Sequence, residues 1–306
     1  MTVTLNGKVY KAFGFNVMSE IPLPELPWVY TKKEIDILIE FADLTEIWAE
    51  VNEPNRYFYI DEGSVLFQIP NIATFIVQDG YKILVSPLRD ATEDYLRLYI
   101  LGTCMGAILL QRKILPLHGS AIEVNGKAYL IVGDSGAGKS TLASALINRG
   151  KRLITDDVIP VTLTAEGIPM VTPSYPQQKL WQESLNQFGI SSEKFRPIVD
   201  RETKFAVPVS DKFATDCLPL AGVFELIKSN SVDINLTPIL HLERLHTLYY
   251  HTYRNFMIGP LGLMEWHFKM TAAIIHEIKI YQLQRPEDRF TADELTSLVL
   301  NTIERK

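Results

Sequence analysis

The first hundred residues carry short runs of β-branched and aromatic side chains, which polar residues, glycine or proline interrupt. Such runs are typical of strands. Asp79-Gly80 joins two of them and favours a tight hairpin, because glycine accepts the positive φ of the turn. We therefore expect an antiparallel, β-rich N-terminal region. Its predicted strands are Asp36–Phe41, Arg56–Ile60, Val65–Ile69, Thr74–Gln78 and Tyr81–Ser86.

A longer apolar segment, Glu93–Arg112, has helical character. Thr92 can cap its start, and acidic residues in the first turn and basic residues in the last suit the helix dipole. Its middle is apolar on all sides, so we expect a buried helix. The uncharged run Leu98–Leu110 has 13 residues, whereas a membrane-spanning helix needs about 20. We expect a domain boundary after this helix, which divides the chain into 1–112 and 113–306.

Beyond Leu117 the pattern changes to strands that alternate with helices. Lys127–Val132 is a continuous apolar strand, a glycine-rich loop follows, and helix Lys139–Asn148 precedes the strand Lys151–Thr155. This order is typical of α/β architecture, so we expect an α/β core and an α+β chain overall. The remaining predicted elements are a hairpin of Val158–Thr164 and Ile168–Thr172, an amphipathic helix within Gly262–Ile280 and a final helix over Thr291–Glu304.

The composition is typical of a globular protein, and the charge argues against some classes of function. The 306 residues are 47% hydrophobic and 22% charged, with a net charge of −6. An acidic chain without a run of Lys or Arg is a poor candidate for nucleic-acid binding. The N-terminus lacks the pattern of a signal peptide, and two cysteines suit a reducing compartment. We expect a cytoplasmic protein with neither a nucleic-acid nor a membrane partner; a homo-oligomer stays open.

One loop indicates a ligand. Gly133-Asp-Ser-Gly-Ala-Gly-Lys-Ser140 matches the phosphate-binding pattern G-x-x-x-x-G-K-[ST], between an apolar strand and a helix. The glycines let backbone N–H groups surround phosphate oxygens, Lys139 adds a positive charge, and the Ser140 hydroxyl can reach Mg²⁺. We predict that the chain binds ATP with Mg²⁺. The predicted nucleotide-binding residues are Gly133, Asp134, Ser135, Gly136, Ala137, Gly138, Lys139, Ser140 and Thr141.

Two adjacent acids follow the strand Lys151–Thr155. Because strand carboxyl ends face the same crevice as the phosphate loop, Asp156 and Asp157 are expected near the nucleotide. One of them can hold Mg²⁺, and the other can accept a proton from an attacking hydroxyl. His118, ten residues before the loop strand, is a weaker candidate. His241, His246 and His251 do not share a helix face, so no zinc site is predicted.

Phosphoryl transfer also needs cations that neutralise charge in the transition state. A polar stretch long enough to cover the site carries Arg196, Arg201 and Lys204, and Lys179 is a further candidate. The alternative is that these are solvated loop charges. Trp181, close to Lys179 in sequence, has the character of a core residue rather than a binding platform.

The segments His118–Ala121, Gly126-Lys127, Gly133–Ser140, Arg149-Gly150 and Leu153–Asp157 follow one another in the order and spacing of a known family. Together they resemble the core of HPr kinase/phosphorylase-type P-loop kinases. Other stretches are similar to stand-alone homologues that are encoded beside lasso-peptide biosynthesis genes and phosphorylate the C-terminal serine of a precursor peptide. These stretches are Tyr10–Glu25, Lys179–Trp181, His267–Met270 and Ile280–Pro286.

The resemblance implies a P-loop, HPr-kinase-like nucleotide-binding core and a role for each site residue. It implies Asp156 as the base, Ser140 and Asp157 as Mg²⁺ ligands, and His118 as a contact to the transferring phosphoryl group. We place Lys204 beside them as the catalytic cation. The chain departs from the bifunctional enzymes at Thr141, where those have Glu, and lacks their signature segment, which argues against phosphorolysis and against HPr as the substrate.

Three functions therefore stay open. The first is a serine kinase that acts on the C-terminus of a ribosomal peptide. The second is a kinase of free serine, another small molecule or an HPr-like protein serine on the same scaffold. The third is a nucleotide-gated binding module without transferase chemistry, against which the pair of acids argues.

Overall fold

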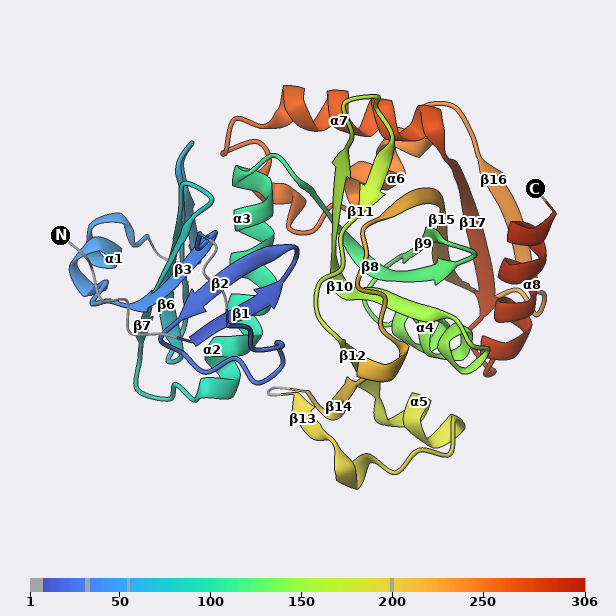
Figure 1. The fold of residues 1–306 in the computed structure, drawn as a ribbon, viewed down its shortest axis with the longest axis horizontal. Coiled ribbons are helices and arrows are strands. Elements are labelled where there is room, and N and C mark those ends of the chain that lie inside the picture. The colour runs from blue at the N-terminus through green and yellow to red at the C-terminus, as the bar shows by residue number, and fades with distance from the viewer. Residues whose placement is uncertain (1–7, 31–33, 54–55, 199–200, 306) are drawn as a thin grey trace. The chain divides into compact units, whose positions relative to one another are not determined.

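The computed structural model describes residues 8–30, 34–53, 56–198 and 201–305, with only the backbone of Arg201 and Glu202. The chain forms two compact units (Figure 1). The first unit runs to Ile114 and also includes Ile198 and Arg254–His267; the second comprises the other described residues from Leu115 on. In the described part of the chain, no helix is both long enough and apolar enough to cross a membrane.

The first unit holds a seven-stranded sheet in the order β1-β2-β3-β7-β6-β5-β4. The predicted hairpin is confirmed: β6 and β7 pair antiparallel, and Asp79 and Gly80 have φ of 53° and 63°. The elements are β1 (Lys8–Ala12), β2 (Phe15–Ser19), β3 (Ile37–Phe41), α1 (Thr45–Val51), β4 (Phe58–Ile60), β5 (Ser64–Ile69), β6 (Ala73–Gln78), β7 (Lys82–Pro87), α2 (Glu93–Tyr99) and α3 (Met105–Gln111).

The expectation of a purely antiparallel sheet is wrong. β3 pairs parallel with both β2 and β7, so the sheet is mixed. Parallel neighbours need long crossover connections. The chain supplies one in the stretch between Ser19 and Ile37, in which Ile21 and Leu23 are fully buried. A short apolar run does not indicate whether a strand pairs parallel or antiparallel, because the connections between the strands determine the direction.

The predicted helix of Glu93–Arg112 is present and buried along most of its length. The Thr92 hydroxyl accepts the N–H of Tyr95 at 3.4 Å and caps the start. A π-helical stretch, Ile100–Cys104, joins α2 to α3. Such stretches have looser hydrogen bonding than an α-helix. This one contains Gly102 and Thr103, both of which lower helix propensity.

The second unit contains the predicted α/β core. Its main sheet has the order β11-β10-β8-β9-β15-β17-β16, and a smaller sheet has the order β12-β14-β13. The elements from Leu115 on are β8 (Leu115–Val124), β9 (Lys127–Val132), α4 (Lys139–Asn148), β10 (Arg152–Leu163), β11 (Pro169–Val171), β12 (Gln177–Trp181), α5 (Gln182–Gln187), β13 (Arg196–Ile198), β14 (Arg201–Pro208), β15 (Leu218–Ser229), β16 (Asn235–Ile239), α6 (Glu243–Tyr250), α7 (Met264–Glu277), β17 (Lys279–Pro286) and α8 (Ala292–Glu304). The end of β13 and the start of α7 fall in the first unit.

The phosphate-loop strand β9 lies in the middle of the main sheet. β15 runs parallel to β9 on one side and to β17 beyond it, while β8 is antiparallel on the other side. Helices α4 and α8 cover one face of this sheet through Leu142, Leu146, Leu295 and Val299. This buried layer holds the helix that begins at the phosphate loop against the strands, which makes the loop a fixed feature of the sheet edge.

Candidate active site

The phosphate loop joins β9 to α4 through a backbone that glycine alone accepts easily. Gly133, Gly136 and Gly138 have φ of 145°, 82° and 107°, a region that side chains disfavour. A Cβ at Gly133 would also lie 2.3 Å from the carbonyl oxygen of Leu226 on β15. The loop is therefore shaped by close approach to the neighbouring strand as well as by its own turns.

Lys139 lies inside the loop and is only 8% exposed. Its ammonium donates to the carbonyl oxygens of Gly133 and Asp134, at 2.8 and 2.9 Å. Burial lowers the pKa of Lys139, whereas the carboxylates of Asp156 and Asp157 act in the opposite direction. The charge is thus fixed at the position where a phosphate would lie, with two acids close by.

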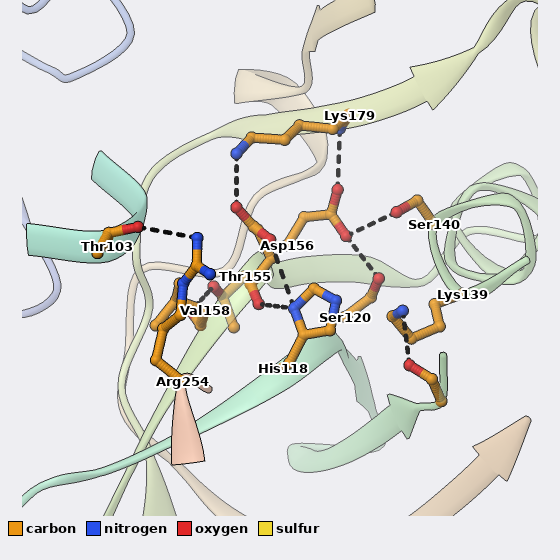
Figure 2. Close-up of polar contacts among 12 residues, drawn as sticks. Thr103, His118, Ser120, Lys139, Ser140, Thr155, Asp156, Val158, Lys179 and Arg254 are labelled. Carbon is orange, nitrogen blue, oxygen red and sulfur yellow. Dashed lines mark hydrogen bonds and ion pairs between the residues drawn. The ribbon is translucent and has the colours of Figure 1, made fainter. Parts of the chain in front are cut away.

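Asp156 is the best-connected acid of the site (Figure 2). Its Oδ1 accepts the hydroxyls of Ser120 at 2.5 Å and Ser140 at 3.1 Å, and its Oδ2 accepts the backbone N–H of Lys179 at 2.9 Å. The residue is 4% exposed. A buried carboxylate needs hydrogen-bond partners, and here they come from β8, α4 and β12. Asp156 therefore links the phosphate loop to two strands.

Asp156 and Asp157 do not end a strand, as the sequence indicated; they lie inside one. β10 continues from Arg152 to Leu163, and it pairs with β8 across both acids, Asp156 opposite Ser120 and Asp157 opposite Gly119. The pairing is irregular between Leu153 and Thr155. Asp157 has φ of 81°, a conformation that costs energy in a non-glycine residue and is common at functional sites.

The backbone distortion turns the two neighbouring carboxylates to different partners. Asp157 Oδ2 accepts the ammonium of Lys179 at 2.5 Å, and Oδ1 lies 3.5 Å from Nδ1 of His118. Burial alone would raise the pKa of Asp157, but Lys179 and His118 hold it well below its usual range. Burial likewise opposes the charge of Lys179, and Asp157 raises that pKa above its usual value.

His118 lies on β8, beside Asp157 of β10. Its Nδ1 lies 3.0 Å from the carbonyl oxygen of Asp157. A carbonyl only accepts, so Nδ1 carries the proton and Nε2 of the neutral ring is an acceptor. Burial lowers the pKa of His118, the charge of Asp157 opposes this, and the charge of Lys139 adds to it. The ring is therefore neutral at neutral pH and lies close to Asp157 and Lys139.

The cations of the polar stretch are placed differently from one another. Lys204 lies opposite Trp181 in the β12–β14 pair, with its ammonium 5.4 Å from the centre of that ring. Its positive charge lowers the pKa of Lys139 and contributes to the low pKa of Asp157. Arg196 is exposed on β13. The side chain of Arg201 lies outside the described part of the structure.

Sequence reasoning missed three contributors. Ser120 is fully buried and holds Asp156, and its signal was its place two residues after His118. Arg285 on β17 donates through Nε to the carbonyl oxygen of Ala137 in the loop at 2.8 Å. Ser184 on α5 lies 2.7 Å from the hydroxyl of Thr141. Arg285 and Ser184 come from distant segments, so only the fold brings them to the site.

Comparison with known proteins bears on this geometry. Residues 111–179, which span β8, β9, the phosphate loop, α4 and β10, match the HPr Serine kinase C-terminal domain. This part of the chain is similar to HPr kinase domains. An HPr kinase/phosphorylase of Bordetella pertussis is 44% identical over 64 residues, which cover 20% of this chain and 21% of that protein. One from Limosilactobacillus reuteri is 37% identical over 105 residues, covering 30% and 32%.

The similarity to these two curated relatives extends over less than a third of the chain. The match covers less than a third of the length of either curated relative. A solved structure of the Hpr(Ser) kinase/phosphatase from Coxiella burnetii aligns over 62% of this chain and 91% of that chain, with 15% identity and a TM-score of 0.34. The matched residues 111–179 include His118, Ser140, Asp156, Asp157 and Lys179, so the similarity coincides with the hydrogen-bonded cluster.

Proposed function

We propose that the chain is an ATP-dependent kinase that transfers the γ-phosphoryl group to a serine hydroxyl. The observation that carries this proposal is the shared carboxylate of Asp156, which accepts hydroxyls from Ser140 of the phosphate loop and Ser120 of β8. Lys179 bonds to Asp156 through its backbone N–H and to Asp157 through its ammonium. Asp157 contacts His118, so these groups form one cluster with the loop. A module that only binds nucleotide has no need of this second acid and histidine.

The acceptor hydroxyl attacks the γ-phosphorus, the bond to the bridging oxygen of ADP breaks, and the hydroxyl proton must leave. Asp157 and His118 are the proton acceptors that the contacts favour, because the side chains are 20% and 34% exposed, whereas Asp156 is 4% exposed. Phosphoryl transfer passes through a loose transition state, in which a strong base is not required. The low pKa of Asp157 is therefore compatible with accepting a hydrogen bond from the incoming serine.

The residues present fit a bound Mg²⁺ at Ser140 and Asp156. Their oxygens lie 3.1 Å apart, and Mg²⁺ in kinases is usually bound by one or two protein oxygens plus substrate phosphates and water. The described residues contain no cluster of three or more His, Cys, Asp or Glu side chains that could hold a metal. When bound, the ion would neutralise charge on the phosphates. The family resemblance assigns the opposite roles to Asp156 and Asp157.

The remaining site residues fit the transfer of a charged group. Lys139 supplies charge to the phosphates, and Lys204 lies where it affects both Lys139 and Asp157. We assign Lys204 to the stabilisation of charge on the transferring group. We further propose that the β-rich part to residue 112 is not required for this chemistry and that the part from residue 113 performs it.

For the acceptor, we propose the C-terminal serine of a lasso-peptide precursor. The support is the similarity of Tyr10–Glu25, Lys179–Trp181 and Ile280–Pro286 to the stand-alone kinases of those pathways. A serine of an HPr-like protein is the second candidate, and the curated relatives that match residues of this core favour it by their names. Free serine is the third acceptor.

The test is transfer from γ-labelled ATP to each acceptor class. We expect label on a precursor peptide that ends in a free serine and none on the same peptide with its last serine changed to alanine. An HPr protein and free serine are offered in parallel. Label on HPr or free serine without label on the peptide contradicts the peptide assignment, and no transfer to any hydroxyl contradicts the kinase proposal.

A further inference from the structure

The segment Tyr250–Tyr253, at the end of α6, contacts both halves of the candidate site. The Tyr250 hydroxyl donates to Oδ1 of Asp134 in the phosphate loop at 3.1 Å. One residue later, the carbonyl oxygen of His251 accepts the backbone N–H of His118 at 2.7 Å. This short stretch thus forms hydrogen bonds with both the phosphate loop and His118, which in the proposed kinase lies on the acceptor side.

The same segment is paired with β8 like a short strand. Leu117 and Thr252 form an isolated antiparallel bridge, and Tyr253 donates its N–H to the carbonyl oxygen of Pro116 at 2.7 Å. The ring centre of Tyr253 lies 5.7 Å from that of His118. The position of His118 therefore depends on this segment through its backbone and through its side chain.

A buried pair anchors the segment to the sheet. The His251 side chain is 5% exposed, and its Nε2 lies 2.9 Å from Oε1 of Glu225 on β15. The hydrogen bond from His251 lowers the pKa of Glu225, and an ionised carboxylate only accepts, so Nε2 carries the proton. The other oxygen of Glu225 accepts the amide of Gln282 on β17 at 3.2 Å.

Glu225 stands at the level where the phosphate loop begins. It is in register with Val132, the last residue of β9, and with Gln282 on β17. Because Glu225 is fixed on these parallel strands, its bond to His251 fixes Tyr250–Tyr253 relative to the end of the sheet where the loop begins. Because a single hydrogen bond adds only modest net stability, the pair is better explained by the geometry it imposes.

We propose that Glu225 and His251 are positioning residues, which hold Tyr250–Tyr253 so that the phosphate loop and His118 keep one mutual geometry. The inference rests on the proposed kinase function, in which nucleotide and acceptor must meet within the reach of a bond. Neither residue touches the reacting atoms. A displacement of about 1 Å in such a frame can cost about 100-fold in rate.

The test compares Glu225→Ala, Glu225→Gln and Gln282→Leu. Glu225→Ala removes the anchor, so we expect kcat to fall roughly 10- to 100-fold, with a smaller change in KM for ATP. Glu225→Gln keeps an acceptor for His251 and should restore most of the rate. Gln282→Leu removes the other partner of Glu225 and leaves the segment in contact, so its rate should stay close to wild type. Equal losses in all three variants would show a purely structural role and overturn the inference.

A double variant separates positioning from loss of stability. If Glu225 acts through His118, the Glu225→Ala change should cost little further rate in a His118→Ala background. Costs that multiply fully would contradict the inference. Thermal melting of every variant identifies those that fail to fold. For them the replacement is Tyr250→Phe, which keeps the ring and removes the hydroxyl that bonds to Asp134.

A measurement without phosphoryl transfer keeps this inference apart from the kinase proposal. The NMR signals of the His118 ring, assigned with His118→Ala, should shift in Glu225→Ala and not in Gln282→Leu. Unchanged His118 signals in folded Glu225→Ala overturn the positioning inference even if the wild type is a kinase. Shifted signals in a protein that phosphorylates no acceptor uphold it while the kinase proposal fails.

Discussion

The hydroxyl of Ser140 lies 3.1 Å from a carboxylate oxygen of Asp156, a residue sixteen positions further along the chain. The same oxygen accepts the hydroxyl of Ser120. Ser140 belongs to α4, the helix after the phosphate loop, whereas Asp156 lies on β10 and Ser120 on its antiparallel neighbour β8. Asp156 therefore faces the helix that begins at the phosphate loop, whereas Asp157 faces His118.

Asp156→Asn should change the requirement for Mg²⁺. The amide keeps the shape of the side chain but loses the charge that would attract a cation beside Ser140. We expect a higher Mg²⁺ concentration for half-maximal phosphoryl transfer and a fall in kcat of about 100-fold, since charged hydrogen bonds are worth roughly 1.5–3 kcal/mol each. Steady-state rates over a Mg²⁺ titration measure both quantities.

Asp157→Asn is the matched control for that prediction. It should lower kcat at saturating Mg²⁺ and leave the half-maximal concentration unchanged. If Asp157→Asn shifts the Mg²⁺ dependence and Asp156→Asn does not, the roles follow the family resemblance instead.

Lys139→Met should weaken nucleotide binding. The buried ammonium is the positive charge of the loop, and one charged hydrogen bond contributes roughly 1.5–3 kcal/mol. We expect the Kd for ADP to rise about 10- to 100-fold, as measured by calorimetry. Lys127→Met, on the exposed first residue of β9, should bind ADP like the wild type. Equal affinity of Lys139→Met and the wild type would contradict the phosphate-binding role.

Asp157→Asn should lower the pKa of His118 further. Burial already lowers it, and the negative charge of Asp157 is the largest opposing influence. Asparagine tolerates the φ of 81° at this position better than most residues, so the backbone carbonyl bonded to Nδ1 should stay in place. The NMR titration of His118 should therefore move its midpoint to lower pH. A midpoint at higher pH would show that another group sets its charge.

Lys204→Met should reduce kcat more than it raises KM for ATP, because a cation that acts on the transition state contributes little to ground-state binding. We expect a loss of about 10-fold or more in kcat. Arg196→Met, from the same polar stretch but exposed on β13, serves as the control and should keep the wild-type rate. The reverse ranking would place the transition-state cation on β13.

Gly119→Ala should destabilise the fold. A Cβ there would lie 2.2 Å from the carbonyl oxygen of Ile131 on β9, and backbone cannot move aside easily. We expect a loss of about 1–3 kcal/mol in the free energy of unfolding. Gly259→Ala meets nothing within 4 Å and should be nearly neutral. Denaturant unfolding measures both, and equal stability of the two variants would contradict the close approach of β8 to β9.

Local signals predicted the elements well. The Asp79-Gly80 hairpin, the cap at Thr92, the loop between β9 and α4 and the final helix all depend on residues close in sequence, so the pattern contained them. The pairing of β3 with β2 and β7 was not predictable, because a short apolar run looks the same in parallel and antiparallel sheets. Asp156 and Asp157 were expected after a strand, since two adjacent charges look like its end, but β8 supplies partners that keep them inside β10.

The amino-acid sequence alone predicts a loop of the phosphate-binding pattern, two acids and a histidine, because that chemistry needs particular residue types at short spacing. Which acid faces Ser140 and which faces His118 is visible only in the folded chain. That choice depends on the positive φ of Asp157 and on contacts from β8 and β12. The positions of Glu225, His251 and Arg285 also depend on the fold, since these residues come from separate segments that meet only after the sheet has formed.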